Sequence, residues 1–219
     1  MKNTVQPKFI TASLIAVAGF ILSTAATEAA LYHIDINTAA LNLPANSGDA
    51  PFSLDFQFND GGVLGNNTAT ITNFTFGGGS ATGSPTLFDG ALGNIGSTVT
   101  LNNSGPFQEL YQTFTPGAVL GFDVSLTQNL DGLTPDSFVV AILDKNPFNI
   151  PTTGIGDSLL HADIDTTSPL TIAQLNLSSG TGSYAGVTVS AIPEPGTALW
   201  GAAFGLIAGV RRIRNRKAA

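Results

Sequence analysis

Strict alternation of apolar and polar residues over short runs constrains the fold of this chain more than any other sequence feature. In residues 52–59 the apolar positions are Phe52, Leu54, Phe56 and Phe58. The polar positions between them are Ser53, Asp55, Gln57 and Asn59. Successive side chains of an extended strand point to opposite faces, whereas a helix would place apolar residues three and four apart. The run therefore predicts a β-strand with one buried aromatic face and one solvated polar face.

Similar runs recur through the middle of the chain. We expect further strands at residues 32–37, 68–76, 95–101, 109–114, 120–127, 138–143, 160–165, 170–177 and 187–192. The alternation slips by one residue in the second of these runs, which predicts a β-bulge near Thr72 and Asn73. The run at 138–143 is apolar throughout, so its period also allows a short buried helix. Short strands joined by Gly, Asn, Asp and Pro predict an all-β fold with a single antiparallel β-sandwich or jelly-roll-like domain.

The first 29 residues have the order of a secretory signal peptide. Lys2 and Lys8 precede an apolar run over residues 9–22, and small and polar residues follow it. This run has 14 residues, fewer than the roughly 18 to 20 that a membrane-spanning helix needs. Small residues permit cleavage after Ala26 or after Ala29. We therefore expect residues 1–29 to form a signal helix that a signal peptidase removes, with an uncleaved N-terminal anchor as the alternative.

The C-terminal segment has three parts in a fixed order. The first part is Pro193, Glu194 and Pro195. Prolines on both sides of the glutamate keep this part extended. Next, 13 apolar residues at 198–210 give about 20 Å of helix, less than a hydrocarbon core about 30 Å thick. Five cations beginning with Arg211 and Arg212 favour retention of the end in the cytoplasm. The order predicts a body exported across the inner membrane and transiently anchored by a short hydrophobic transmembrane helix.

These three parts together resemble the PEP-CTERM sorting signal of Gram-negative bacteria that make exopolysaccharide. In that family an exosortase, a membrane-embedded transpeptidase, acts near the Pro-Glu-Pro element and releases or re-anchors the protein. The resemblance implies an exosortase-like transpeptidase, the inner membrane and biofilm exopolysaccharide as partners. It also implies a location at the cell surface or in the extracellular matrix. We therefore expect a signal peptide at residues 1–29, a β-sandwich body at 30–192 and a sorting signal at 193–219.

The body between the two signals is almost purely anionic. From residue 31 to residue 192 it has thirteen acids, with Glu109 as the one glutamate, against Lys145 as the single cation, a formal charge of -12. Such a body repels phosphate backbones, which excludes nucleic acid as a partner. The chain has no Cys, which excludes disulfides, thiolate metal sites and Cys nucleophiles.

Residues that could catalyse a reaction are scarce in the body. Its two histidines, His33 and His161, both fall in predicted strands, where we expect them on solvated polar faces. A Ser-His-Asp hydrolase would need His161 and Asp163 to meet a serine in a concave pocket, but the sequence has no Gly-x-Ser-x-Gly turn. Glycoside hydrolysis needs two carboxyl groups, one of them protonated, and no pair stands out among the aspartates. We expect a non-catalytic cell-surface or extracellular-matrix protein, with a hydrolase as an alternative.

Carbohydrate binding, assisted by calcium, is another function that the sequence allows. Calcium takes hard oxygen ligands, which Asp and Asn in loops supply. The candidate calcium ligands are Asp60, Asp131 and Asp157. Sugar sites combine aromatic rings with a few polar groups. The candidate ligand face consists of His161, Asp163, Asp165, Tyr111 and Tyr184. No cofactor other than calcium is expected.

Overall fold

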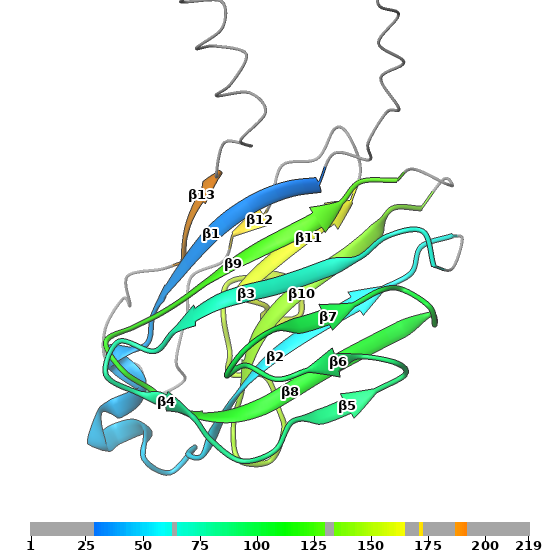
Figure 1. Ribbon diagram of the computed structural model, residues 1–219. Coiled ribbons are helices and arrows are strands. Elements are labelled where there is room, and N and C mark those ends of the chain that lie inside the picture. The colour runs from blue at the N-terminus through cyan, green and yellow to red at the C-terminus, as the bar shows by residue number, and fades with distance from the viewer. Residues whose placement is uncertain (1–28, 63–64, 130–133, 165–170, 173–186, 192–219) are drawn as a thin grey trace, which may run out of the picture.

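The computed structural model describes residues 29–62, 65–129, 134–164, 171–172 and 187–191, which form two β-sheets stacked as a sandwich (Figure 1). Every strand pairing in these residues is antiparallel. The predicted all-β sandwich is confirmed. The expected signal helix and C-terminal helix lie outside the described residues. Within the described ranges, no helix has the length and apolar character needed to cross a membrane.

One sheet, which we call sheet A, has the strand order β13-β1-β9-β3-β7-β6. Its strands are β1 (Ala29–Asn37), β3 (Ala69–Thr75), β6 (Leu92–Gly93), β7 (Val99–Leu101), β9 (Val119–Thr127) and β13 (Val187–Ala191). The first and last strands of the body are neighbours, with Tyr32 opposite Ala191. The start of β1 and the end of β13 therefore lie at the same end of the sandwich (Figure 1).

The other sheet, sheet B, has the order β12-β11-β10-β2-β8-β4, and β5 also pairs with β8. Its strands are β2 (Phe52–Asn59), β4 (Ser80–Ala81), β5 (Thr86–Phe88), β8 (Phe107–Thr115), β10 (Asp136–Leu143), β11 (Leu160–Ile164) and β12 (Thr171–Ile172). Two short 3-10 helices, at Ala39–Asn42 and Pro44–Asn46, lie in the connection from β1 of sheet A to β2 of sheet B, and a third, at Ile155–Asp157, lies between β10 and β11 of sheet B.

The core lies between the inner faces of the two sheets, and Phe56 of β2 is near its centre. Its ring centroid lies 5.4 Å from that of Phe122 on β9, 6.0 Å from that of Phe74 and 6.3 Å from that of Phe138 on β10. All four apolar residues of the run at 52–59 are buried in this core. The aromatic face expected from the alternation is therefore confirmed.

The predicted β-bulge is also confirmed. The register between β3 and β9 shifts between Thr72 and Thr75, and Asn73 has a φ of 57°. Asn adopts this left-handed conformation more readily than bulky residues do. The shift brings Phe74 and Phe76 against the same core as the buried residues at the start of β3.

The predicted strand at 138–143 is confirmed as part of β10, which excludes the alternative of a short helix. The run at 95–101 is a strand only from Val99 onward. Its first residues form a turn, because the Asn94 side chain accepts hydrogen bonds from the Gly96 amide at 2.9 Å and the Ser97 hydroxyl at 3.3 Å. Of the run at 170–177, only the two residues of β12 are described.

The polar face predicted for residues 52–59 is solvated over only half its length. Gln57 and Asn59 are partly exposed, but Ser53 and Asp55 are buried, Asp55 to 0% exposure. The neighbour of Asp55 on β10 is Ala141, and β10 is buried on both of its faces at this point. The expectation that Asp55 is solvated was therefore wrong, because the alternation within one strand does not report what covers the adjacent strand.

Candidate functional site

The predicted ligand face lies in part on the outer face of sheet B, which is turned away from the core. Tyr111 of β8 and His161 and Asp163 of β11 point to this face, since the residues on either side of each are buried. His161 Nε2 lies 3.0 Å from Asp163 Oδ1. Asp165 and Tyr184 lie outside the described residues. The structure thus places the described part of the predicted ligand face on a single sheet.

Two rows of cross-strand neighbours fill the middle of this outer face. The first row is His161, Val139, Gln57, Glu109 and Phe88, from β11 to β5. The second row is Ala141, Asp55, Tyr111 and Thr86. Directly opposite side chains in an antiparallel sheet have Cβ atoms about 4.5–5.5 Å apart, so members of a row contact their neighbours. The face therefore combines two aromatic rings with two carboxyl groups and an amide.

Gln57 connects the two carboxyl groups of this face. Its Nε2 donates hydrogen bonds to Asp55 Oδ2 at 2.7 Å and to Glu109 Oε1 at 3.4 Å. The second oxygen of Asp55, Oδ1, has no hydrogen-bond partner, and no other buried side-chain oxygen or nitrogen in the described ranges shares this property. A buried polar atom without a partner costs free energy, so it marks a place where a further donor would be stabilising.

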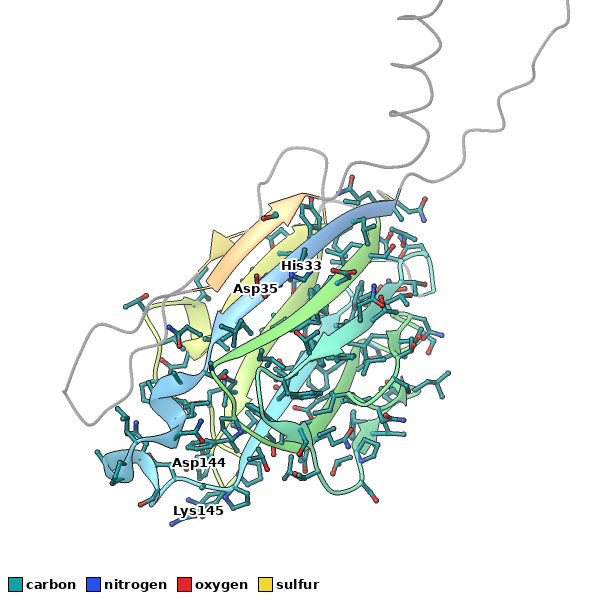
Figure 2. All side chains as sticks on the ribbon, turned by 60° about the vertical axis from the view of Figure 1, so that its left-hand side comes forward. His33, Asp35, Asp144 and Lys145 are labelled. Atoms are coloured by element: carbon teal, nitrogen blue, oxygen red, sulfur yellow. The ribbon has the colours of Figure 1, made fainter. Side chains whose placement is uncertain are left out.

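The environment of these carboxyl groups favours their protonated forms. Burial, with a contribution from the charge of Glu109, raises the pKa of Asp55 to about 8. Burial likewise raises the pKa of Glu109. Lys145, which alone among the described residues is a lysine or arginine, donates its Nζ hydrogen to the Gly48 carbonyl 2.6 Å away, near the first two 3-10 helices (Figure 2). No lysine or arginine in the described ranges therefore neutralises the pair, and the raised pKa of Asp55 favours its protonated form near neutral pH.

A second titratable cluster lies on the outer face of sheet A, where Figure 2 shows His33 and Asp35 on β1. His33 Nδ1 lies 2.6 Å from Asp123 Oδ1, and His33 Nε2 lies 3.4 Å from Asp35 Oδ1. The hydrogen bond to Asp123 is the main cause of the raised pKa of His33. For Asp123, burial alone would raise the pKa, but hydrogen bonds from Asn73 and His33 outweigh this effect and lower the pKa. This cluster holds three adjacent strands together through a partly exposed ion pair.

The residues named for a hydrolase lie on the outer face of sheet B, where Ser137 of β10 is the cross-strand neighbour of Asp163. The cross-strand neighbours of His161 are Val139 and Thr171. Asp163 is exposed and lies two residues along the same strand. A pocket lined in part by Phe52, Phe114 and other residues near the first 3-10 helix contains neither His161 nor Asp163.

The predicted calcium ligands belong to separate hydrogen-bond networks. Asp60 Oδ1 accepts a hydrogen bond from Asn103 Nδ2 at 3.0 Å, and the same nitrogen lies 2.9 Å from Asp136 Oδ2. Asp157 instead accepts a hydrogen bond from the Thr152 amide at 3.0 Å, in the connection between β10 and β11. Asp131 lies outside the described residues. In the ranges that are described, no three His, Cys, Asp or Glu residues are grouped so that they could hold a metal ion.

The pair of Asp55 and Glu109, joined by Gln57, was missed by sequence reasoning. Alternation placed Asp55 and Gln57 on the polar side of one strand, and it would also place Glu109 on the polar side of another. What the sequence does not give is the register that sets Gln57 opposite Glu109, 52 residues away.

The C-terminal segment carries the most specific similarity to known proteins. Residues 191–217 match the family model of the PEP-CTERM protein-sorting motif. The chain carries a PEP-CTERM sorting domain. The matched range contains all of the predicted sorting residues, which are Pro193, Glu194, Pro195, Arg211 and Arg212. Comparisons with curated proteins and with solved structures gave no match.

The PEP-CTERM match indicates an exported protein that is sorted by an exosortase-type system. The match begins at Ala191, the last residue of β13, and the tail beyond it lies outside the described residues. Transient anchoring of the PEP-CTERM tail in the inner membrane, and processing by a signal peptidase, stay predictions from the sequence.

Proposed function

We propose that the protein is a non-catalytic component of the cell surface or extracellular matrix, delivered there by export and exosortase-type sorting. The observation that carries this proposal is the position of the PEP-CTERM motif. It starts at Ala191, and Ala191 pairs with Tyr32 near the start of the body. The predicted export signal and the sorting signal thus adjoin the same end of the sandwich. A body held at the membrane by that end would present both outer faces to the surroundings.

The charge of the body supports the same proposal. From residue 31 to residue 192 the formal charge is -12, and a net charge far from zero keeps a protein soluble and resists self-association. A protein that works among densely packed polymers benefits from both properties. We expect biofilm exopolysaccharide to be the surrounding polymer, as the PEP-CTERM resemblance implies.

Mass spectrometry of the protein isolated from its native host tests the sorting part of this proposal. The expected result is a chain without its signal peptide and with a cut near Pro193–Pro195, recovered from the cell surface or the matrix. A variant that ends at residue 192 is the matched control, and we expect it to lose surface retention while its body stays folded. Recovery of the intact chain from the cytoplasm would contradict the proposal. Deletion of the gene should weaken biofilm cohesion, and an unchanged matrix would contradict the matrix role.

Carbohydrate binding is the second candidate function, and the outer face of sheet B favours it. That face brings Tyr111 and Phe88 beside acidic and amide side chains, the combination that sugar sites use. Calcium assistance is a separate part of this candidate. An ion bound by Asp60 and its neighbours would stabilise the folded state and raise the melting temperature in calcium relative to EDTA. An identical melting temperature in both would contradict the calcium part alone.

A further inference from the structure

We propose that the Glu109 face, defined as Asp55, Gln57, Phe88, Glu109 and Tyr111 on the outer side of sheet B, binds a neutral oligosaccharide. This inference rests on the second candidate function, carbohydrate binding, and assigns it a place and a class of ligand. In the proposed site Gln57, Glu109 and the two rings contact the sugar, and Asp55 positions Gln57 through one oxygen and offers the other to a sugar hydroxyl group. The residues come from three adjacent strands, β5, β8 and β2.

The arrangement of the rings supports a sugar ligand. Phe88 is 55% exposed and lies next to Glu109 across the strands, while Tyr111 is partly exposed in the adjacent row. The ring centroid of Phe88 lies 5.9 Å from that of Phe107, so a small aromatic platform exists beside the carboxyl groups. Sugar rings have one apolar face of C–H groups, which packs on an aromatic ring, and a rim of hydroxyl groups, which needs polar partners. The Glu109 face offers both kinds of contact within two rows of side chains.

The partnerless oxygen of Asp55 indicates that the site is incomplete as it stands. Asp55 Oδ1 is buried and accepts no hydrogen bond from the described residues, although Oδ2 of the same group accepts one from Gln57. A sugar hydroxyl group is small and neutral and can both donate and accept, so it can satisfy this oxygen whether Oδ1 carries the proton of Asp55 or not. Gln57 and Tyr111 are the partly exposed neighbours of the buried Asp55 along and across the strands, so the proposed site requires one of these side chains to rotate and admit the ligand.

The polar groups of the face favour a neutral ligand over an ion. The face has no described lysine or arginine that would attract an anionic sugar such as a polyuronate, and the charge of -12 on the body repels one. A metal ion is disfavoured for a different reason. The donor atom Gln57 Nε2 already contacts both Asp55 Oδ2 and Glu109 Oε1, so an amide nitrogen stands where a cation would bind. Neutral hydroxyl groups can both donate to the carboxyl groups and accept from Gln57.

Isothermal titration of the processed protein from its native host tests the inference. The neutral probes are cellohexaose, laminarihexaose and maltohexaose, and the anionic probe is a hexamer of galacturonic acid. The site variants are Glu109→Gln and Tyr111→Ala, with Tyr111→Phe as a variant that keeps the ring. Matched controls remove the same chemical groups elsewhere on the surface: Asp49→Asn removes an exposed carboxylate, and Phe148→Ala an exposed ring. Urea unfolding of each variant verifies that the body is folded.

We expect at least one neutral hexasaccharide to bind and the anionic probe to bind more weakly. Glu109→Gln and Tyr111→Ala should each weaken binding by about tenfold or more, since a hydrogen bond to a charged group and a stacked ring are each worth on the order of 1.5 kcal/mol. Tyr111→Phe and both controls should stay within about twofold of the parent protein.

The outcomes that would contradict the proposal can be told apart, because each overturns a different part of it. Neutral sugar binding that survives Glu109→Gln and Tyr111→Ala would overturn the assigned face and leave carbohydrate binding in place. Tighter binding of the galacturonic acid hexamer would overturn the ligand class. Absence of binding to every probe would overturn both this site and the carbohydrate candidate, whereas the sorting and matrix proposal is judged by the cleavage and gene-deletion experiments.

Discussion

Asp55 should make the stability of this protein fall as the pH rises from 4 to 8. The pKa of its carboxyl group is 3.8 in the unfolded reference and about 8 in the folded protein, mainly because of burial. Between these values the folded state holds a proton that the unfolded state has lost. The stabilising effect of that proton is therefore complete below pH 4 and is lost progressively up to about pH 8.

The size of the effect follows from the two pKa values. One unit of pKa difference corresponds to about 1.4 kcal/mol, so a rise from 3.8 to about 8 corresponds to an upper limit of about 6 kcal/mol, of which about 5 kcal/mol falls between pH 4 and pH 8. Asp55 is fully buried, so solvent does not screen its interactions. A change of this size is a large share of the total stability of a typical domain, about 5–15 kcal/mol.

Urea unfolding of the parent protein and the Asp55→Asn variant at pH 4, 6 and 8 measures this effect. The asparagine has nearly the same shape and does not titrate. We expect the difference in free energy of unfolding between the two proteins to move by up to about 5 kcal/mol in favour of the variant between pH 4 and pH 8. Taking the difference cancels the titration of other groups such as His33.

Two further variants test whether the pH dependence comes from Asp55 and its neighbour. Glu109→Gln should reduce the pH dependence, because the charge of Glu109 contributes to the raised pKa of Asp55. Asp49→Asn, at an exposed position, should leave it unchanged. Parallel stability curves for the parent protein and Asp55→Asn, within about 1 kcal/mol across this range, would refute the reasoning that burial keeps Asp55 protonated.

Three other predictions concern the core, the amide network and the histidine cluster. Phe56→Ala should lower the free energy of unfolding by about 3–5 kcal/mol. Phe148→Ala, at a 70% exposed position, should change it by less than about 0.5 kcal/mol. Equal losses of the two variants in urea unfolding would contradict the assigned core. Asn103→Ala should cost about 2–4 kcal/mol, since Asn103 is buried and its Nδ2 lies within hydrogen-bond distance of oxygens on three side chains. A melting temperature equal to that of the parent would count against that network. Asp123→Asn should lower the pKa of His33 in an NMR titration. The variant should also lose a stabilisation that in the parent protein is complete below pH 6.5 and is lost as the pH rises through the raised pKa of His33. An unchanged titration of His33 would show that the 2.6 Å contact is not formed in solution.

The long strands could be predicted from the sequence because their period is a local property of the chain. Residues 52–59 and 120–127 alternate without interruption, and both are strands in the structure. Even the bulge at Asn73 was visible, since a slip in the alternation is also local. The short strands β4, β5 and β6 could not be predicted in this way. Each has two or three residues, too few to establish a period, and each is defined by pairing with β8 or β7.

The candidate site was only partly predictable, for a related physical reason. His161 was expected on a polar face and lies on one, because it stands between two buried neighbours on its own strand. The burial of Asp55 depends on Ala141 of another strand, and its pKa depends on Glu109 of a third. Such contacts are set by the register between strands, which a single sequence does not specify. The PEP-CTERM motif was fully predictable, since its parts act in linear order.

The pairing of β1 with β13 has a consequence for how the protein reaches its folded state during secretion. Translocation proceeds from the N-terminus, so β1 emerges early. One edge of β1 pairs with β9, and its other edge has no partner strand until residues 187–191 emerge. Those residues directly precede the PEP-CTERM tail. A chain that terminated before Val187 would leave the backbone amides and carbonyls of β1 free to recruit a strand from another molecule, and would therefore be prone to aggregate.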